Sequence, residues 1–453
     1  MKLGSVEGLQ FWSDVHRETP VDVFVHVPFD FEGNLPVALE EFDWRRTTWD
    51  GSRTIRQGGT MEPRIMRSMS IGLLCTAVVG GASIQQLRAS RSASGLRRLA
   101  RTGAPPLRSF EAVALESDTQ YTANASVGDL NGDGALDIVL AKGRHWPQKS
   151  LVLFGDGKAH FTPGPPLPNG PYRSYSAPLF DMDGDGSRDI VLSSDAPDPK
   201  VILLNDGKGR FRIGGTFGDP GWPTRNVAVG DLNGDGYPDI AVANRGGPNY
   251  VCFNDGKAHF ACRVLGPESA ATILIADMDG DGHADIVVPC RDSCQSVIYF
   301  DDGKGSFPRK EPFGPAGSST RAMAVADFNG DGRPDIAGAH EELGIYVYFN
   351  LGHRTMGQGT RIADLDAEPY SMIAGDLNRD GKPEIVVGYV NAPGAVYFND
   401  GSGSRYRRVA FGDGSGAIYG MALADLNGDG YPDLVAARSG APSLLLFSRP
   451  AKK

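Results

Sequence analysis

Short apolar runs alternate with polar turns along most of the chain, from about residue 110 to its end. Typical runs are Ile240-Ala-Val and Val297-Ile-Tyr-Phe300, which are rich in β-branched and aromatic residues. Glycine, proline, asparagine and aspartate bound these runs, and apolar segments of this length and composition are typical of β-strands. Glycine accounts for 60 of 453 residues, nearly twice the usual share of roughly 7%. The pattern therefore predicts an all-β fold with many turns.

One polar string recurs between these runs and divides the chain into repeats. The string is Asp-x-(Asn/Asp)-x-Asp-Gly-x-x-(Asp/Glu), and its seven copies start at Asp129, Asp181, Asp231, Asp277, Asp327, Asp376 and Asp425. Neighbouring copies lie 46 to 52 residues apart. Seven copies at near-constant spacing indicate a repeat architecture, in which each repeat is one unit that cannot bury its apolar faces alone.

Each repeat contains four apolar runs, the third and fourth joined by a hairpin turn such as Asn205-Asp-Gly. The last repeat ends at Leu444-Leu-Leu-Phe447 without its fourth run, and Ser109-Phe-Glu-Ala-Val-Ala-Leu115 has the form of the missing strand. Radial packing of four-stranded sheets buries both faces of each. We therefore expect residues 109–450 to form a seven-bladed β-propeller of four-stranded antiparallel blades, with the ring closed by the N-terminal strand.

The repeated string is suited to calcium, because oxygen atoms at alternate positions of a tight loop converge on one point. An EF-hand differs in needing a glutamate at position twelve and flanking helices. Within each string we expect positions one, three, five and nine to bind through side chains and position seven through its carbonyl. The expected ligands are Asp129, Asn131, Asp133, Ala135 and Asp137; Asp181, Asp183, Asp185, Ser187 and Asp189; Asp231, Asn233, Asp235, Tyr237 and Asp239; Asp277, Asp279, Asp281, His283 and Asp285; Asp327, Asn329, Asp331, Arg333 and Asp335; Asp376, Asn378, Asp380, Lys382 and Glu384; Asp425, Asn427, Asp429, Tyr431 and Asp433.

These loops predict up to seven structural Ca²⁺ sites that hold the turn of each sheet, rather than a calcium sensor. The sixth loop departs from the pattern, with Arg379 at the fourth position and Glu384 at the ninth. The formal net charge of the chain is −10. That balance argues against nucleic acid as a partner, and without calcium the clustered carboxylates should repel one another and loosen the fold.

The calcium motif and hairpins such as Phe154-Gly-Asp-Gly and Phe253-Asn-Asp-Gly resemble the FG-GAP/VCBS-type repeats of the integrin α-subunit head. The resemblance covers roughly residues 109–448 and implies a seven-bladed β-propeller. Related propellers serve as adhesion modules, lectins and, less often, scaffolds for polysaccharide lyases. The resemblance therefore specifies the fold more closely than the function.

The N-terminal quarter of the chain has a different composition. Residues 1–60 show no clear periodicity and are left unassigned. Residues 61–82 have the form of a secretory signal, with Arg64 and Arg67 before an apolar run and Gly80-Gly81-Ala82 after it. Translation from Met61 or Met66 would place this signal at the true N-terminus. Residues 83–108, which contain several arginines and no acid, predict a basic flexible linker.

Four cysteines beyond the signal support the expectation of export. Cys252 and Cys262 flank a hairpin turn, and Cys290 and Cys294 bracket a short loop, so each pair is close enough to form a disulfide. Disulfides persist in oxidising compartments. We expect a monomer that is secreted, periplasmic or on the cell surface, with no membrane span after signal cleavage.

A second register predicts a binding surface at the end of the ring opposite the calcium loops. The residues six positions before each loop are Ala123, Tyr175, Arg225, Ala271, Arg321, Tyr370 and Tyr419. Tyrosine and arginine are enriched in binding hot spots, so Tyr175, Arg225, Arg321, Tyr370 and Tyr419 are the candidate ligand-binding residues. We expect a non-catalytic binding or adhesion module for a carbohydrate or an extracellular protein. The alternative is a polysaccharide lyase or hydrolase on the same scaffold, for which His340 and Glu341 with Arg321 are the residues to consider.

Overall fold

The computed structural model describes the backbone of residues 2–6, 9–13, 21–26 and 73–77, and the backbone and side chains of residues 106–451. The chain divides into two compact units, Met1–Ala100 and Arg101–Lys453. Every regular element in the described residues is a β-strand. In this part of the chain no helix is long and apolar enough to cross a membrane.

The first unit contains one four-stranded antiparallel sheet. Its strands are β1 (Lys2–Val6), β2 (Leu9–Ser13), β3 (Val21–His26) and β4 (Leu73–Ala77), paired in chain order. Strand β4 lies inside the segment that the sequence predicts to be a signal peptide. The rest of that segment, and residues 83–105 of the predicted linker, lie outside the described residues, so the signal and the linker stay predictions.

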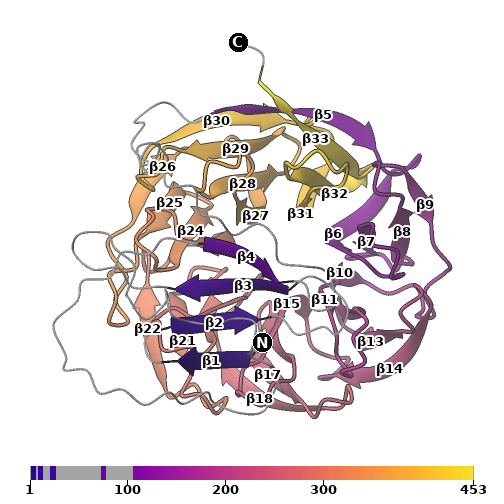
Figure 1. Ribbon diagram of the computed structural model, residues 1–453, viewed down its shortest axis with the longest axis horizontal. Helices are drawn as coiled ribbons and strands as arrows, with labels where there is room; N and C mark the ends of the chain where they lie inside the picture. The colour runs from indigo at the N-terminus through magenta and orange to yellow at the C-terminus, as the bar shows by residue number, and fades with distance from the viewer. Residues whose placement is uncertain (1, 7–8, 14–20, 27–72, 78–105, 452–453) are drawn as a thin grey trace. The chain divides into compact units, whose positions relative to one another are not determined.

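The second unit is a ring of seven blades of four strands each, as the sequence predicts (Figure 1). The seventh and first blades are joined into one eight-stranded sheet, because Ser439 of the seventh pairs with Tyr121 of the first. The first three blades are β6 (Gln120–Gly128), β7 (Asp137–Lys142), β8 (Leu151–Gly155) and β9 (Phe161–Pro163); β10 (Ser174–Ser176) with β11 (Leu179–Phe180), β12 (Asp189–Ser194), β13 (Lys200–Asn205) and β14 (Phe211–Phe217); and β15 (Thr224–Gly230), β16 (Asp239–Asn244), β17 (Asn249–Asn254) and β18 (Phe260–Gly266). In the second blade, β10 and β11 together take the place of one innermost strand.

The other four blades repeat this order. They are β19 (Leu274–Ala276), β20 (Asp285–Val288), β21 (Ser296–Phe300) and β22 (Arg309–Phe313); β23 (Thr320–Ala326), β24 (Asp335–His340), β25 (Gly344–Tyr348) and β26 (Thr360–Ala363); β27 (Pro369–Gly375), β28 (Glu384–Tyr389), β29 (Gly394–Asn399) and β30 (Tyr406–Phe411); and β31 (Ala417–Ala424), β32 (Asp433–Ala441), β33 (Leu444–Pro450) and β5 (Arg108–Ala114).

Strand β5 closes the ring by completing the last blade from the other end of the chain. It pairs antiparallel with β33 over seven residues, from Arg108 opposite Pro450 to Ala114 opposite Leu444. Arg108 is buried, and its Nε donates a hydrogen bond to Ser448 Oγ at 2.8 Å. The sequence places Arg108 at the end of the flexible linker, whereas in the structure it is the first residue of β5.

The core lies between neighbouring blades. The residue that follows the last acid of each loop is completely buried, and this set consists of Ile138, Ile190, Ile240, Ile286, Ile336, Ile385 and Leu434. Each apolar cluster takes residues from two adjacent sheets; Val139 and Val152 of the first blade, for example, belong to one cluster with Ile190 and Leu203 of the second. Burying each of these side chains stabilises the fold by about 1.5–3 kcal/mol. This burial favours the closed ring over separate sheets.

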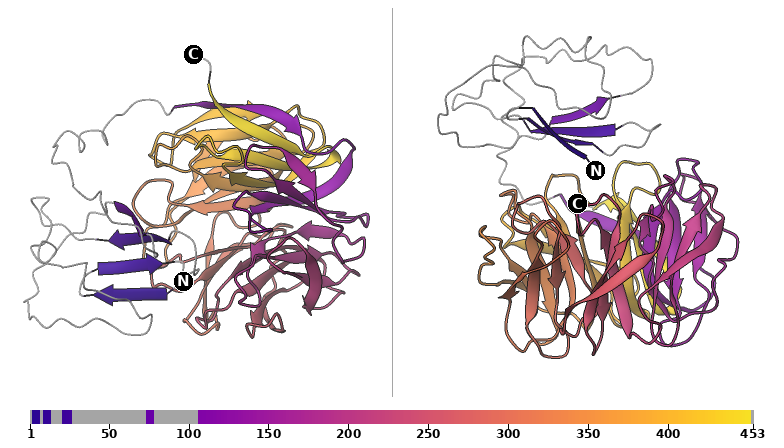
Figure 2. Two further views of the ribbon diagram at one scale, coloured as in Figure 1. Left: turned by 45° about the vertical axis from the view of Figure 1, so that its right-hand side comes forward. Right: turned by 90° about the horizontal axis from the view of Figure 1, so that it is seen from below.

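The chain direction gives the ring two chemically different faces. Each acidic loop joins the first strand of a blade to the second, and each hairpin turn joins the third strand to the fourth. Because the strands of a blade alternate in direction, these two connections share one face, called here the loop face. The connections between second and third strands, and those between blades, lie on the other face, which we call the open face. The right-hand view of Figure 2 shows the ring edge-on, with its two faces.

Candidate functional site

The innermost strands carry a repeated irregularity on the side of the open face. In six blades the register between the first and second strands shifts by one residue, which leaves that residue of the inner strand unpaired. The unpaired residues are Ala123, Tyr175, Arg225, Arg321, Tyr370 and Tyr419. Such β-bulges redirect side chains and are frequent beside functional sites. They are the residues of the predicted binding register; the seventh member, Ala271, precedes β19.

All seven residues of this register line one cavity at the centre of the ring, with a volume of about 190 Å³. The open-face connections add Arg144 and His145 from the first blade, Arg245 from the third and Arg291 from the fourth. Sequence reasoning did not identify these three arginines. Arg245 and Arg291 each stand six residues after the last acid of their loops, at Asp239 and Asp285, and this register could have identified both.

The arginines and tyrosines of the cavity pack on one another. The guanidinium of Arg144 lies 3.4 Å from the ring centre of Tyr419, that of Arg225 lies 4.7 Å from Tyr175, and that of Arg321 lies 4.5 Å from Tyr370. The rings of Tyr370 and Tyr419 are themselves 4.2 Å apart. Stacking of this kind restricts the rotamers of long arginine side chains, so the cavity presents its cationic groups in fixed positions.

Four of the five cavity arginines also contact a carboxylate outside the lining. Arg225 is 2.6 Å from Asp195, and Arg245 is 3.6 Å from Asp292. The remaining contacts join Arg291 to Glu341 at 3.9 Å, and Arg321 to both Glu341 and Glu368. Arg144 has no carboxylate partner among the described residues. It bonds to Ser439 Oγ at 3.3 Å, and its Nε is buried without a hydrogen-bond partner in this part of the chain.

An exposed aromatic group stands at the edge of the cavity beside Arg144. Trp146 is 54% exposed and Tyr121 is 37% exposed, and their ring centres lie 4.6 Å apart. His145 connects this pair to the cavity through an edge-to-face contact with Tyr175 at 6.1 Å. Burial, followed by the positive charges of Arg144 and Arg225, lowers the pKa of His145 below its usual value.

His340, considered from sequence as an acid or base, lies behind the cavity rather than in it. The side chain is 1% exposed. Its Nδ1 bonds to Thr320 Oγ1 at 2.9 Å and its Nε2 bonds to the hydroxyl of Tyr348 at 2.6 Å. Burial lowers its pKa to about 4. Asn244 occupies the equivalent place in the third blade and bonds to Thr224 in the same way, so this position belongs to the scaffold.

On the loop face, the carboxylates of the acidic loops accept hydrogen bonds from backbone N–H groups. In the first loop, Asp129 accepts hydrogen bonds from the backbone N–H groups of Gly132 at 2.7 Å and Gly134 at 3.0 Å. Asp137 is completely buried and accepts from the backbone of Leu130 at 2.8 Å and of Gly155 at 2.9 Å. The last acid of the loop therefore ties the loop to the hairpin of the same blade.

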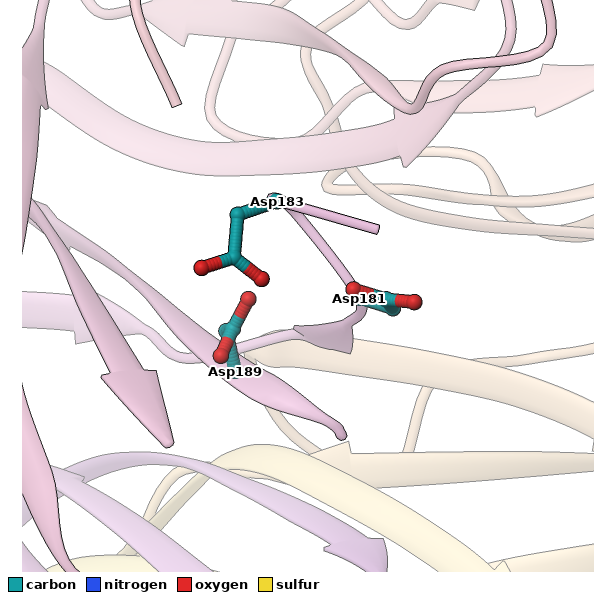
Figure 3. Close-up of side chains that lie close together, drawn as sticks. All are labelled: Asp181, Asp183 and Asp189. Atoms are coloured by element: carbon teal, nitrogen blue, oxygen red, sulfur yellow. The ribbon is translucent and has the colours of Figure 1, made fainter. Parts of the chain in front are cut away.

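Two loops bring three carboxylates close together, with ligand atoms within 4.8 Å of one another: Asp181, Asp183 and Asp189, and Asp277, Asp279 and Asp285. Figure 3 shows Asp183 and Asp189 with their carboxylates pointing toward one another beside Asp181. Asp183 Oδ1 is buried without a hydrogen-bond partner among the described residues. An all-oxygen donor set with an unsatisfied carboxylate oxygen fits a hard divalent cation. The other five loops have asparagine at the third position, which offers an amide oxygen instead.

Electrostatics in the loops favour a cation. Burial raises the pKa of Asp189, Asp239 and Asp285 to about 7, and that of Glu384 to about 8. Nearby loop carboxylates add to each increase. In the fourth loop an arginine already neutralises part of the negative charge. Arg354 from the neighbouring hairpin bonds to Asp279 and lies 3.6 Å from Asp281.

Neighbouring blades are joined on the loop face by asparagine side chains that sequence reasoning did not identify. The Nδ2 group of each donates to the backbone carbonyl of the second residue in the preceding blade's loop, at 2.7 to 2.9 Å. The donors are Asn205, Asn254, Asn350 and Asn399, and the acceptors are Leu130, Met182, Met278 and Phe328. The recurring first asparagine of the hairpins was a signal for this contact.

Both cysteine pairs considered from the sequence lie together in the structure. Cys252 and Cys262 are directly opposite one another in the β17–β18 ladder, with Cα atoms 3.9 Å apart, and form a disulfide. Cys290 and Cys294 also form a disulfide, across the β20–β21 connection, with Cα atoms 5.5 Å apart. The second disulfide adjoins Arg291 of the cavity and closes the loop that carries it.

Radially arranged blades, each with an acidic loop after its first strand, define the chain as a repeat β-propeller. The model of the FG-GAP-like repeat matches residues 129–192, 181–242, 231–288, 277–338 and 376–436. The chain belongs to this FG-GAP-like repeat family.

Solved structures with a similar fold include a protein–protein complex and a lectin. BBS1N in complex with ARL6DN, in crystals soaked with mercury, is 13% identical with a TM-score of 0.52, and the match covers 78% of this chain and 99% of that one. An Agrocybe aegerita lectin that recognises non-reducing terminal N-acetylglucosamine is 19% identical with a TM-score of 0.50, covering 75% of this chain and 86% of that one. At these identities the likeness concerns the fold. A search of curated protein sequences finds no significant match.

Proposed function

We propose that this protein is an exported, calcium-stabilised β-propeller that binds a carbohydrate in the central cavity of its open face. The observation that carries the binding site is the bulge repeated in six inner strands, which places a residue of the register at one cavity each time. A bulge interrupts strand pairing. Its repetition at the cavity is easier to explain by ligand binding than by stability.

The acidic loops support the calcium part of the proposal. Their first, third, fifth and ninth positions supply oxygen ligands, and Asp183 has a buried oxygen without a partner among the described residues. Bound calcium would neutralise carboxylates whose pKa is raised by burial, such as Asp189. The ion would stabilise the turn between the first two strands of a blade. The ligand at the open face would be bound by protein side chains alone.

Export is supported by the two disulfides and by the signal-like segment 61–82. Disulfides are rare in reducing compartments, and both cysteine pairs are bonded in the structure. A carbohydrate ligand is supported by the exposed stacked pair of Tyr121 and Trp146 beside the cavity, since aromatic faces pack against sugar rings. One structural neighbour is a lectin, and another is a complex with a protein, so a protein ligand is the second candidate.

The enzyme alternative receives less support from the geometry. A lyase or hydrolase needs a base that reaches its substrate. His340 is buried, with both ring nitrogens bonded, and Glu341 is engaged by Arg291 and Arg321. Binding without turnover is therefore the function that the site supports best.

The experiment is a glycan array probed with the calcium-loaded full chain, followed by titration of the best glycan. Tyr419→Ala should weaken binding at least tenfold, because it removes a ring from the cavity and a support from Arg144. Tyr237→Ala is the matched control, since the Tyr237 side chain is 44% exposed on the loop face and the change keeps the backbone carbonyl that we expect to bind calcium. Equal losses in both variants, or new reducing or unsaturated ends in the glycan, would contradict the proposal.

A further inference from the structure

The central cavity differs in charge from the rest of the molecule. The chain has a formal net charge of −10, yet five arginines and no aspartate or glutamate line the cavity. The arginines come from four different blades, and they are Arg144, Arg225, Arg245, Arg291 and Arg321. A concave site lined by one sign of charge concentrates ligands of the opposite sign.

The carboxylates behind the lining do not fully compensate this charge. Within the described residues, four carboxylates contact the cavity arginines: Asp195, Asp292, Glu341 and Glu368. Five guanidinium groups against four carboxylates leave one formal positive charge, which belongs to Arg144. The cavity therefore has capacity for one anionic group, located beside the first blade.

Arg144 is held in place to receive such a group. Its guanidinium stacks on Tyr419 at 3.4 Å, while Ser439 Oγ accepts one hydrogen bond at 3.3 Å. Its Nε is buried without a partner in the described residues, although guanidinium N–H groups are strong donors that match planar oxyanions. Arg321 Nη1 on the other side of the cavity is likewise buried without a hydrogen-bond partner in this part of the chain.

We propose that the cavity binds an acidic carbohydrate, with the oxyanion of a carboxylated or sulfated sugar bonded to Arg144 and the sugar ring packed against the tyrosines. The volume of about 190 Å³ is below the roughly 300–1,000 Å³ of pockets for drug-sized ligands. It therefore suits a single charged ring rather than a length of chain. The exposed pair of Tyr121 and Trp146 would then contact the next ring outside the cavity.

This inference rests on the proposed function, because it names the ligand class of the same site. The probes are trigalacturonic acid, its fully methyl-esterified form and a 6-sulfated galactose trisaccharide, titrated calorimetrically into the calcium-loaded full chain. The ester keeps the rings and removes the charge. We expect the acid or the sulfated sugar to bind, the ester to bind at least tenfold more weakly, and affinity to fall with rising salt. The acid and the sulfate ester distinguish the two sources of the oxyanion.

Arg144→Gln is the decisive variant, because Arg144 has no carboxylate partner in the described residues whose charge the change would leave unpaired. Loss of a charge-assisted hydrogen bond should weaken binding of the charged probe at least tenfold, without a change in melting temperature. Arg407→Gln is the matched control, since Arg407 is exposed on the outer strand β30 and likewise has no carboxylate partner among the described residues.

The outcomes separate this inference from the proposed function. If the ester binds as tightly as the acid, or Arg144→Gln leaves affinity unchanged, the acidic-ligand inference is wrong while carbohydrate binding stands. If no charged probe binds the wild-type protein, the inference is overturned, and the glycan array with Tyr419→Ala still decides whether the cavity binds a neutral sugar.

Discussion

At Arg379 the chain holds an arginine in a backbone conformation that the other six loops give to glycine. Its φ is 57°, and the six glycines at the same loop position have φ between 71° and 79°. A side chain in this left-handed region costs about 1–2 kcal/mol. Arg379→Gly should therefore raise the free energy of unfolding by about 1 kcal/mol or less, because the flexibility of glycine in the unfolded chain offsets part of the gain.

The measurement is denaturant unfolding in the presence of calcium. Ala135→Gly is the control, because Ala135 in the first loop is not among the residues with positive φ. This change should lower the free energy of unfolding by up to about 1 kcal/mol. A loss of stability at both positions would mean that the Arg379 conformation carries no strain.

His340 makes the free energy of unfolding depend on pH. Burial lowers its pKa to about 4 in the folded protein, whereas an unfolded histidine titrates near 6.5. Between about pH 4 and pH 6.5, His340 is protonated in the unfolded chain but neutral in the folded protein. The stability that His340 contributes is therefore complete above about pH 6.5 and is lost as the pH falls toward 4, by up to about 3 kcal/mol.

The test compares His340→Asn with the wild type across that pH range. Asparagine stands at the equivalent place in the third blade, as Asn244, so the fold accommodates it. The buried loop carboxylates titrate in both proteins and cancel in the difference. We expect the wild type to lose stability relative to the variant as the pH falls, and two parallel curves would contradict the assignment.

At the scale of the element, two hairpins depart from the pattern that joins the blades. Four hairpins donate an asparagine amide to the preceding loop, whereas the first blade has Gly155 and the fourth blade has Asp301 at that position. Asp301 is 3% exposed, and its Oδ1 has no hydrogen-bond partner among the described residues. Burial raises the pKa of this carboxyl. In the fourth blade an acceptor thus stands where the second, third, fifth and sixth blades have an amide donor.

Exchanging the two residue types should have opposite effects in two blades. Asp301→Asn restores the donor and should stabilise the protein by about 1 kcal/mol, whereas Asn350→Asp removes one and should destabilise it by about 1–3 kcal/mol. Thermal and denaturant unfolding of both variants at pH 7 measures the effect. Equal signs for the two changes would show that the amide contacts between blades add nothing to stability.

At the scale of the whole molecule, the repeat predicts the fold almost completely. The seven strings, the four runs between them and the missing last strand are visible in the sequence, so blade number, strand order and closure by β5 follow from counting. The bulges at the cavity are different, because no local residue type marks them: alanine, tyrosine and arginine all occupy that position. The register of residues six positions before each loop identified the cavity residues. The bulges that direct their side chains were visible only in the structure.

The arginines from the open-face connections show a second limit. Arg144, Arg245 and Arg291 lie on three different connections, and their convergence depends on closing the ring. The sequence register identifies only Arg225 and Arg321, whereas three of the five arginines that give the cavity its charge come from these connections. Sequence periodicity therefore predicts positions within a blade better than contacts across the centre of the ring.

We expect the stability of the ring to depend on calcium bound at the loop face. Seven loops each bring several carboxylates together, and cation binding to the folded state alone adds about 2.7 kcal/mol for a site at a free concentration of 100 times its Kd. We expect the full chain to melt at a distinctly higher temperature with millimolar calcium than with chelator, and magnesium to give a smaller shift because it requires stricter octahedral geometry. Scanning calorimetry with both ions measures this.

The second loop is the best place to assign the effect to a site. Its carboxylates lie close together, and its nearest cation is Arg212, 3.9 Å from Asp183, whereas in the fourth loop Arg354 bonds directly to Asp279. Asp183→Asn should therefore remove part of the calcium-dependent shift. Asp206→Asn, on the adjacent hairpin, should leave that shift in place. If chelator and calcium give the same melting temperature in the wild type, the loops are held by their own hydrogen bonds, such as those to Asp181 and Asp189, and need no ion.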